Sequence, residues 1–115
     1  MLNFIFKKFS KEKKVKVHTV EIPDVPVGYA LQAETNRKLK NFEQAMDYIN
    51  KAIDIEQNND MYWITKALIY RDIKNYGKAI ETINKAIEIN DSVQITKDIK
   101  QEISYLLEHN IEQYK

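Results

Sequence analysis

Two stretches of this chain, residues 41–59 and 75–93, carry nearly the same sequence at a constant offset. Eight of their 19 aligned positions are identical, and four more differ only conservatively. A fixed period such as this step from position 41 to position 75 is typical of architectures in which one small structural unit stacks on its copy. The repeat therefore constrains the fold strongly, because one unit cannot bury its apolar face alone and must bury it against the next.

Within each copy, apolar residues recur at steps of three and four, which places them on one face of a helix. The first copy carries Phe42, Ala45, Met46, Ile49, Ala52, Ile53 and Ile55. The second copy carries Tyr76, Ala79, Ile80, Ile83, Ala86, Ile87 and Ile89. Asn41 and Asn75 directly precede these helices and are the expected N-caps, with Gln44 as the capping partner of Asn41.

Each copy follows a second helical stretch, so the predicted unit is a pair of helices joined by a short turn. Residues 26–39 open with Pro26, which suits the first position of a helix. Residues 60–73 open with Asp60, which is the expected N-cap of that helix. The chain has only two Gly and two Pro in 115 residues, a composition that favours long helices over a turn-rich β fold.

This unit resembles the tetratricopeptide repeat (TPR), whose pattern places aromatic and small residues at fixed positions of a helix pair. In residues 60–93 the matching residues are Trp63, Ala67, Tyr70, Tyr76, Ala79, Ile83 and Ala86. In residues 26–59 they are Tyr29, Ala33, Phe42, Ala45, Ile49 and Ala52. The small positions make physical sense, because alanine lets two helix backbones approach closely while aromatic rings fill the surrounding space.

Several positions depart from the family pattern. Asn36 replaces the third aromatic residue of the first unit, which is the weaker match. Lys40 and Lys74 stand where glycine is usual in the turn between the two helices, and Gln57 and Asp91 replace the closing proline.

The resemblance and the flanking sequence together predict an all-α fold of helix-turn-helix repeats, a fragment of a TPR-like α-solenoid with a capping helix. The predicted parts are a basic amphipathic segment and linker at 1–25, repeats at 26–59 and 60–93, and the cap at 94–115. A terminal helix with one polar face is what a repeat array needs to seal its last unit. Ser92 is its expected N-cap. Its expected apolar stripe consists of Ile95, Ile99, Ile103, Leu106, Leu107 and Ile111.

No catalytic, cofactor or metal site is predicted. The two histidines, His18 and His109, have no ligand partner at metal-binding spacing. The two glycines, Gly28 and Gly77, are too far apart to form a phosphate-binding loop. There is no Cys, and no apolar stretch is long enough to span a membrane. We therefore expect a binding protein and not an enzyme.

The resemblance implies a concave groove, lined by the first helix of each unit, that receives a peptide or an amphipathic helix. The groove positions are Val27, Ala30, Glu34, Arg37 and Lys38 in the first unit and Met61, Ile64, Leu68, Arg71 and Asp72 in the second. TPR domains that grip the acidic C-termini of chaperones use a Lys and Asn pair where this chain has Ala30 and Glu34. We therefore expect an apolar groove with Arg37, Lys38 and Arg71 as a basic rim. The alternative is that its apolar residues pack against the C-terminal helix or a second chain.

The N-terminal segment differs in charge from the rest of the chain. Residues 1–16 hold six Lys and one Glu, a net charge of +5, whereas residues 17–115 have a net charge of −4. Four roles are open for it: docking in the chain's own groove, docking on a partner, contact with an anionic membrane, or none of these. The contacting residues would be Leu2, Ile5, Phe6, Phe9, Lys7 and Lys8.

These features predict a protein–protein interaction module that acts as a scaffold in the cytoplasm. The alternative is an adaptor held peripherally at a membrane surface by residues 1–14. The expected partner is a protein or peptide, which includes the chain's own N-terminal segment or a second copy. Nucleic acid is not an expected partner, because a groove that reads RNA must be basic whereas this body is acidic.

Overall fold

The computed structural model describes residues 25–113, and within this range it contains only helices and no strand. The helices are α2 (Pro26–Lys38), α3 (Phe42–Ile55), α4 (Asp60–Asp72), α5 (Tyr76–Ile89) and α6 (Gln94–Gln113). The predicted all-α fold of helix-turn-helix repeats is confirmed. No helix in the described range is long and apolar enough to cross a membrane.

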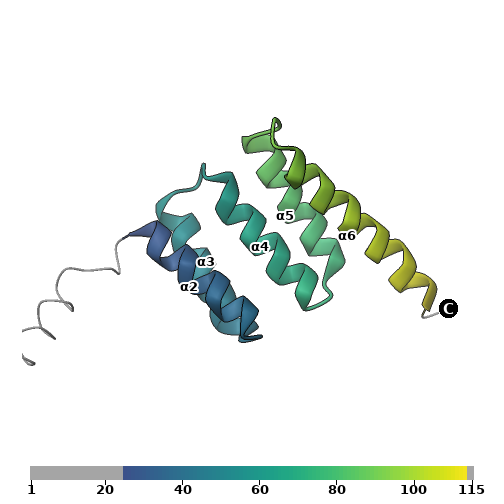
Figure 1. The fold of residues 1–115 in the computed structure, drawn as a ribbon, viewed down its shortest axis with the longest axis horizontal. Coiled ribbons are helices and arrows are strands. Elements are labelled where there is room, and N and C mark those ends of the chain that lie inside the picture. Colours follow the sequence, from purple (N-terminus) through teal and green to yellow (C-terminus); the bar gives the residue numbers. More distant parts are fainter. Residues whose placement is uncertain (1–24, 114–115) are drawn as a thin grey trace, which may run out of the picture.

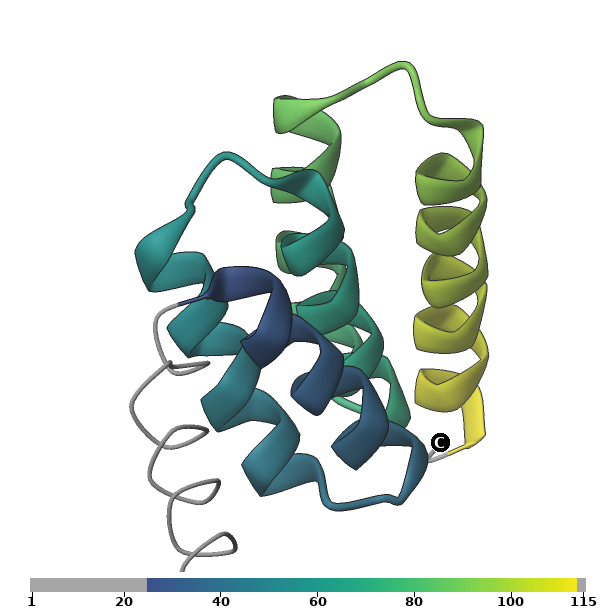
Figure 2. The ribbon, with the colours of Figure 1, turned by 60° about the vertical axis from the view of Figure 1, so that its left-hand side comes forward.

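The helices form two antiparallel hairpins, α2 with α3 and α4 with α5, and α6 follows them (Figure 1). The first helices α2, α4 and α6 run in the same direction across the view, and α3 lies behind α2. Because α3 also packs on α4, and α5 on α6, each second helix joins its own first helix to the next one. Figure 2 shows α6 at the end of the resulting stack.

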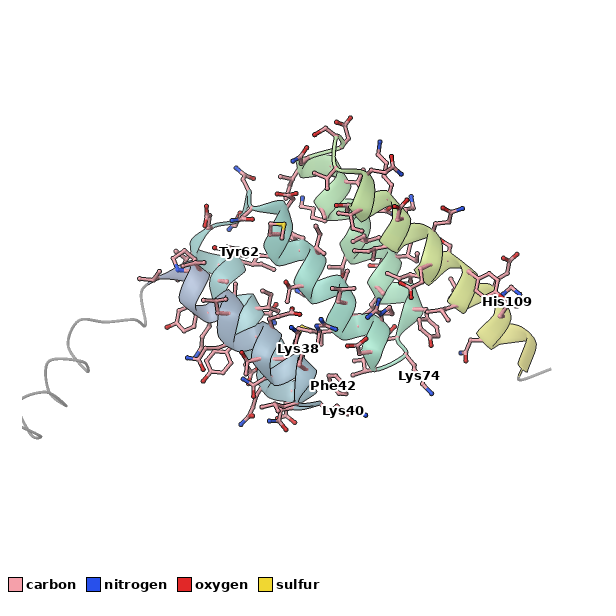
Figure 3. All side chains as sticks on the ribbon, in the orientation of Figure 1. Lys38, Lys40, Phe42, Tyr62, Lys74 and His109 are labelled. Atoms are coloured by element: carbon pink, nitrogen blue, oxygen red, sulfur yellow. The ribbon has the colours of Figure 1, made fainter. Side chains whose placement is uncertain are left out.

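The core is built from small residues at repeated positions. Ala45 and Ala79, which are equivalent residues of the two repeats, are fully buried, and so are Ala52 and Ala86. A methyl side chain at these positions lets neighbouring helices approach closely. Larger side chains fill the space between the units, where Tyr62 is buried against the first hairpin (Figure 3).

A lysine of each second helix covers an aromatic ring of the first helix in its own unit. The Nζ of Lys51 lies 5.5 Å from the ring centroid of Tyr29, and the Nζ of Lys85 lies 5.9 Å from that of Trp63. Both pairs occupy the same positions of the repeat. Such cation–π contacts contribute roughly 0.5–1 kcal/mol each at exposed sites. They give a physical reason for the lysine that is identical in the two copies.

The turns within the two hairpins share one unusual backbone conformation. Lys40 and Lys74, which lie along the lower edge of the molecule in Figure 3, both have φ 67°. In the first turn the Lys40 N–H donates to the Arg37 carbonyl at 3.0 Å, and the Asn41 N–H donates to the Asn36 carbonyl at 2.8 Å. This pair of bonds is the Schellman motif, which normally places glycine at the left-handed residue. The two departures from the family glycine therefore fall at strained positions.

Both predicted asparagines occupy the N-cap position of their helix, but only Asn75 makes the expected side-chain bond. The Asn75 side chain accepts a bond from the Lys78 N–H at 3.3 Å. The Asn41 side chain makes no such bond and instead donates to the Asn36 Oδ1 at 3.3 Å. The second unit has Tyr70 where the first has Asn36, so Asn75 meets no competing carboxamide there.

The other two predicted caps, Asp60 and Ser92, are wrong. The N-cap of α4 is Asn59, whose side chain accepts from the Met61 N–H at 3.0 Å, and Asp60 is the first helical residue. Ser92 lies in the turn before α6, where its hydroxyl donates to the Asn90 Oδ1 at 2.7 Å. At α4 the prediction failed because two adjacent polar residues compete for the cap and the sequence does not decide between them.

The last helix, α6, buries one face against α5 and exposes a polar face. Ile103 is fully buried, and Ile99, Leu106 and Leu107 are partly buried, as the predicted stripe requires. The prediction was wrong for Ile95, which is exposed, and it missed Thr96, which is buried. Ile111 lies outside the described side chains. The exposed polar residues of α6 include Lys97, Asp98, Gln101, Glu102, Ser104 and Glu108.

Candidate binding face

Three exposed apolar residues occupy the same position on α2, α4 and α6. Val27, Met61 and Ile95 are separated by the offset of the repeat, and each is the second residue of its helix. Their exposed fractions are 53%, 60% and 60%. We call these three residues the apolar row, and the surface of α2, α4 and α6 that carries it the first-helix face.

A chain of ion pairs crosses the same three helices nearer their C-terminal ends. On α2, Arg37 pairs with Glu34, and its Nη1 also lies 2.8 Å from the Oδ2 of Asp72 on α4. The other carboxylate oxygen of Asp72 lies 3.1 Å from Arg71, whose Nη1 lies 3.0 Å from Glu102 on α6. We call these five residues the ionic ladder. It joins both repeats and the last helix through charged groups.

The ionic ladder changes the expected charge of the rim. Arg37 and Arg71 were expected to make it basic together with Lys38. Instead, carboxylates of the ladder neutralise both arginines. Of the three, only Lys38, exposed at the end of α2 (Figure 3), makes no ion pair within residues 25–113. The hydrogen bonds that Arg37 donates to Glu34 raise the pKa of Arg37 above its ordinary value, so this guanidinium stays charged. The prediction that the rim is basic is therefore wrong for Arg37 and Arg71.

The apolar groove positions separate into exposed and buried residues. Ile64 is only 7% exposed, because it packs with Ala67 and Ile83 in the core of the second unit. Leu68 is partly buried on the same cluster, which Ile99 of α6 also contacts. Ala30 packs against the core of the first unit. Ile64 and Leu68 therefore belong to the core between α4 and α5, and α6 only borders this core through Ile99.

Sequence reasoning missed the contribution of α6 to this face. Ile95 and Glu102 belong to the apolar row and the ionic ladder, and Asp98 and Tyr105 are exposed at groove positions one repeat further on. The missing signal was a third step of the same offset, from Val27 and Met61 to Ile95. The apolar stripe of α6 was interpreted as that of a capping helix, so α6 was not compared with the first helices.

Two groups with shifted pKa values lie between the repeats and are not at this face. Burial raises the pKa of the Tyr62 hydroxyl, and burial lowers the pKa of Lys66. Both shifts are consequences of packing between the units.

The predicted absence of a histidine metal site can be compared with the described residues. His109 is exposed on α6 and stacks on Tyr105 with ring centroids 3.7 Å apart. Among residues 25–113 no three His, Asp or Glu side chains are grouped so that they could hold a metal ion. The proposed contacts of the N-terminal segment, Leu2, Ile5, Phe6, Phe9, Lys7 and Lys8, lie outside the described residues. Membrane contact by that segment therefore stays a prediction.

Comparison with known proteins agrees with the repeat and the fold. The family model described as "Tetratricopeptide repeat" matches residues 28–59 and 62–92. These two matches cover more than half of the chain, and the chain belongs to the tetratricopeptide repeat family. No curated protein sequence matches the chain.

Solved structures of TPR domains resemble the chain closely. The TPR2B domain of yeast Sti1, in complex with an Hsp70 peptide, is 29% identical with a TM-score of 0.63 over 96% of this chain and 90% of that one. The TPR2AB domain of yeast Sti1, in complex with an HSP90 peptide, is 31% identical with a TM-score of 0.59 over 73% of this chain and 32% of that one. The first TPR of Spaghetti (RPAP3), bound to the HSP90 peptide SRMEEVD, shares the fold at 18% identity. Its TM-score is 0.70 over 91% of this chain and 86% of that one.

Proposed function

We propose that this chain is a non-catalytic protein-interaction module whose first-helix face binds a segment of a partner protein. The observation that carries the proposal is the apolar row, Val27, Met61 and Ile95, which is exposed at one position of three successive first helices. Exposed apolar side chains that recur in this way gain free energy when a partner covers them, at roughly 25 cal/mol per Å² of buried apolar area. A cytoplasmic scaffold is the setting that we expect for this binding.

The similarity to TPR2B of yeast Sti1, which is in complex with an Hsp70 peptide, supports a peptide or protein segment as the class of ligand. The chemistry of the ligand should differ from that of an acidic chaperone tail. Ala30 and Glu34 stand where the chaperone-binding TPR domains have a Lys and Asn pair, and the ionic ladder neutralises Arg37 and Arg71. We therefore propose a ligand whose anchors are apolar side chains.

A peptide library displayed on phage and selected against the full chain tests this proposal. Selected peptides are then measured against Met61→Glu, and against Ile55→Glu as a matched control. Ile55 is about as exposed as Met61 but lies on α3, which is a second helix and does not belong to the first-helix face. We expect at least tenfold weaker binding to Met61→Glu, because a carboxylate would be buried against an apolar anchor, and less than twofold change for Ile55→Glu. Equal losses in the two variants would contradict the proposal.

The peptide SRMEEVD, which the Spaghetti (RPAP3) domain binds, tests the class of ligand separately. We expect no saturable binding of this peptide to the wild-type chain. The double variant Ala30→Lys with Glu34→Asn supplies the Lys and Asn pair and removes one carboxylate from Arg37, so it should bind the peptide measurably. Binding by the wild type as strong as by the double variant would show that the face already accepts acidic tails.

A further inference from the structure

We propose that residues 1–16 of the chain occupy its own first-helix face, so that the free protein must release this segment before a partner can bind. The inference rests on the proposed function, since it assigns an occupant to the same face. Three properties of the molecule support it: where the segment joins the described helices, which charges face solvent, and which side chains the segment offers.

The segment enters the molecule beside the apolar row. The first described residue is Val25, one residue before α2, and Val27 is the first member of the row. The chain from Phe9 to Val25 can span roughly 50 Å at about 3.3 Å per residue. Packed helices lie about 10 Å apart, and four such steps lead from α2 through α3, α4 and α5 to α6, so α6 lies within roughly 40 Å of α2. The segment can therefore reach every member of the row.

The solvent-facing charges of the first-helix face are mainly carboxylates. Within the ionic ladder the Glu102 side chain is 53% exposed, whereas the Arg37 side chain is 14% exposed. Asp98 adds a further exposed carboxylate on α6, against the exposed cation Lys38 at the end of α2. Residues 1–16 carry a net charge of +5, so they complement this face. At physiological salt such attraction is effective within about 8 Å, which is the range of a docked segment.

The side chains of the segment also suit the apolar row. Leu2, Ile5, Phe6 and Phe9 supply apolar groups, and Lys7, Lys8 and Lys11 lie among them. Met61, at the centre of the row, has a flexible thioether side chain that adapts to irregular partners. Aromatic residues bury the largest apolar area of any side chain, so two phenylalanines are strong anchors.

Covalent linkage makes weak docking sufficient. A linked segment acts at an effective concentration on the order of millimolar. An intrinsic Kd of about 1 mM would therefore already fill about half of the faces. A competing partner would bind with an affinity reduced by the fraction of faces that are open. Removal of the segment's lysines would then strengthen partner binding, although none of them belongs to the face.

A spin label on the segment tests the proposal in the full chain. The chain contains no Cys, so Ser10→Cys gives a single labelling site. The readout is the broadening of the methyl signals of Met61 and Ile95 on the first-helix face. The matched control is the methyl signal of Ile55, which is exposed at the end of α3. Since α3 returns alongside α2, Ile55 lies near the entry of the segment, whereas Ile95 lies two first helices away.

We expect Met61 and Ile95 to broaden at least threefold more than Ile55. This preference should disappear when Lys7, Lys8 and Lys11 are all changed to Glu, a substitution that leaves residues 25–113 unaltered. Broadening of Ile55 equal to or greater than that of Ile95 in the wild type would overturn the proposal.

A mixture of spin-labelled chain and isotopically labelled chain without the spin label identifies the source of the segment. Broadening in the mixture as strong as in the single chain would mean that a second copy supplies the segment, and this too would overturn the proposal. Neither failure affects the proposed function, which the Met61→Glu comparison with selected peptides tests independently.

Discussion

Arg37 and Asp72 lie 35 positions apart in the sequence, and their side chains meet at 2.8 Å between the first helices of two successive repeats. The same carboxylate contacts Arg71, which extends the connection to Glu102 on α6. Asp72 is thus the acid of the ladder that holds both arginines, and it links the two repeats outside the apolar core.

Removal of this carboxylate should weaken the stack measurably. We expect Asp72→Ala to lower the free energy of unfolding by about 1 kcal/mol, a value at the upper end for partly exposed pairs. The loss should shrink in concentrated NaCl, because salt already screens the attraction between Asp72 and the two arginines in the wild type. Chemical denaturation at low and high salt measures both effects, with Asp47→Ala on the exposed face of α3 as the control. A loss no larger than that of the control would show that the ladder adds no stability.

The strained turns offer a stabilising change. Lys74 has φ 67°, a conformation that costs a residue with a Cβ roughly 1 kcal/mol relative to glycine. We therefore expect Lys74→Gly to raise the free energy of unfolding by about 1 kcal/mol, and Lys40→Gly to act similarly. Lys97→Gly, inside α6, should instead lower it by about 0.5–1 kcal/mol. Thermal melting of the three variants checks these signs, and a destabilised Lys74→Gly would refute the strain.

The buried hydroxyl of Thr96 offers a second stabilising change. Its Oγ1 has no hydrogen-bond partner among the described residues, and Thr96 is almost fully buried on α6. Valine has nearly the same shape without the polar atom, so Thr96→Val should stabilise the fold by about 1 kcal/mol. Thr35→Val is the matched control, because the Thr35 hydroxyl is exposed and donates to the Leu31 carbonyl at 2.9 Å. Denaturation midpoints compare the two, and a destabilised Thr96→Val would reveal a partner for the hydroxyl.

The contact between α5 and α6 should not tolerate a charge. Ala79 is fully buried in a cluster with Tyr76 and Ile103. Ala79→Arg would place a guanidinium in this contact, and its burial should cost more than the few kcal/mol that hold a small array together. Circular dichroism and melting should show an unfolded chain. Gly77→Ala, two positions earlier, should fold and gain about 0.5 kcal/mol, because its added Cβ meets nothing within 4 Å. An Ala79→Arg variant that folds and melts like the wild type would contradict the packing of α6 against Ala79.

The helices and their pairing could be predicted because they depend on patterns that extend over many residues. The apolar residues from Phe42 to Ile55 and from Tyr76 to Ile89 each show the helical spacing several times. A single exception therefore does not change the prediction of a helix. The buried alanines were predicted for the same reason. The prediction of first and second helices followed from the apolar spacing, the helix start signals and the offset of the repeat together.

The details that failed depend on single side chains and on tertiary contacts. Whether Asn41 caps α3 is decided by Asn36, a near neighbour in the sequence that offers a competing carboxamide. Ile64 was placed in the groove because its helix position is the usual one, yet Ile83 and Ala86 enclose it in the folded chain. The charge of the rim was misjudged because Glu102 reaches Arg71 from a helix that was treated only as a cap.

The register of α6 has a consequence for how such a protein could change in length. Its buried side meets α5 much as α4 meets α3, while its outer side is polar. A tandem duplication of residues 60–93 would thus insert a helix pair between α5 and α6. The new pair would make contacts of the α3–α4 kind at one end and of the α5–α6 kind at the other. Each such event would lengthen the apolar row by one side chain. Recombination alone could therefore lengthen the ligand that this surface recognises, without any newly evolved interface.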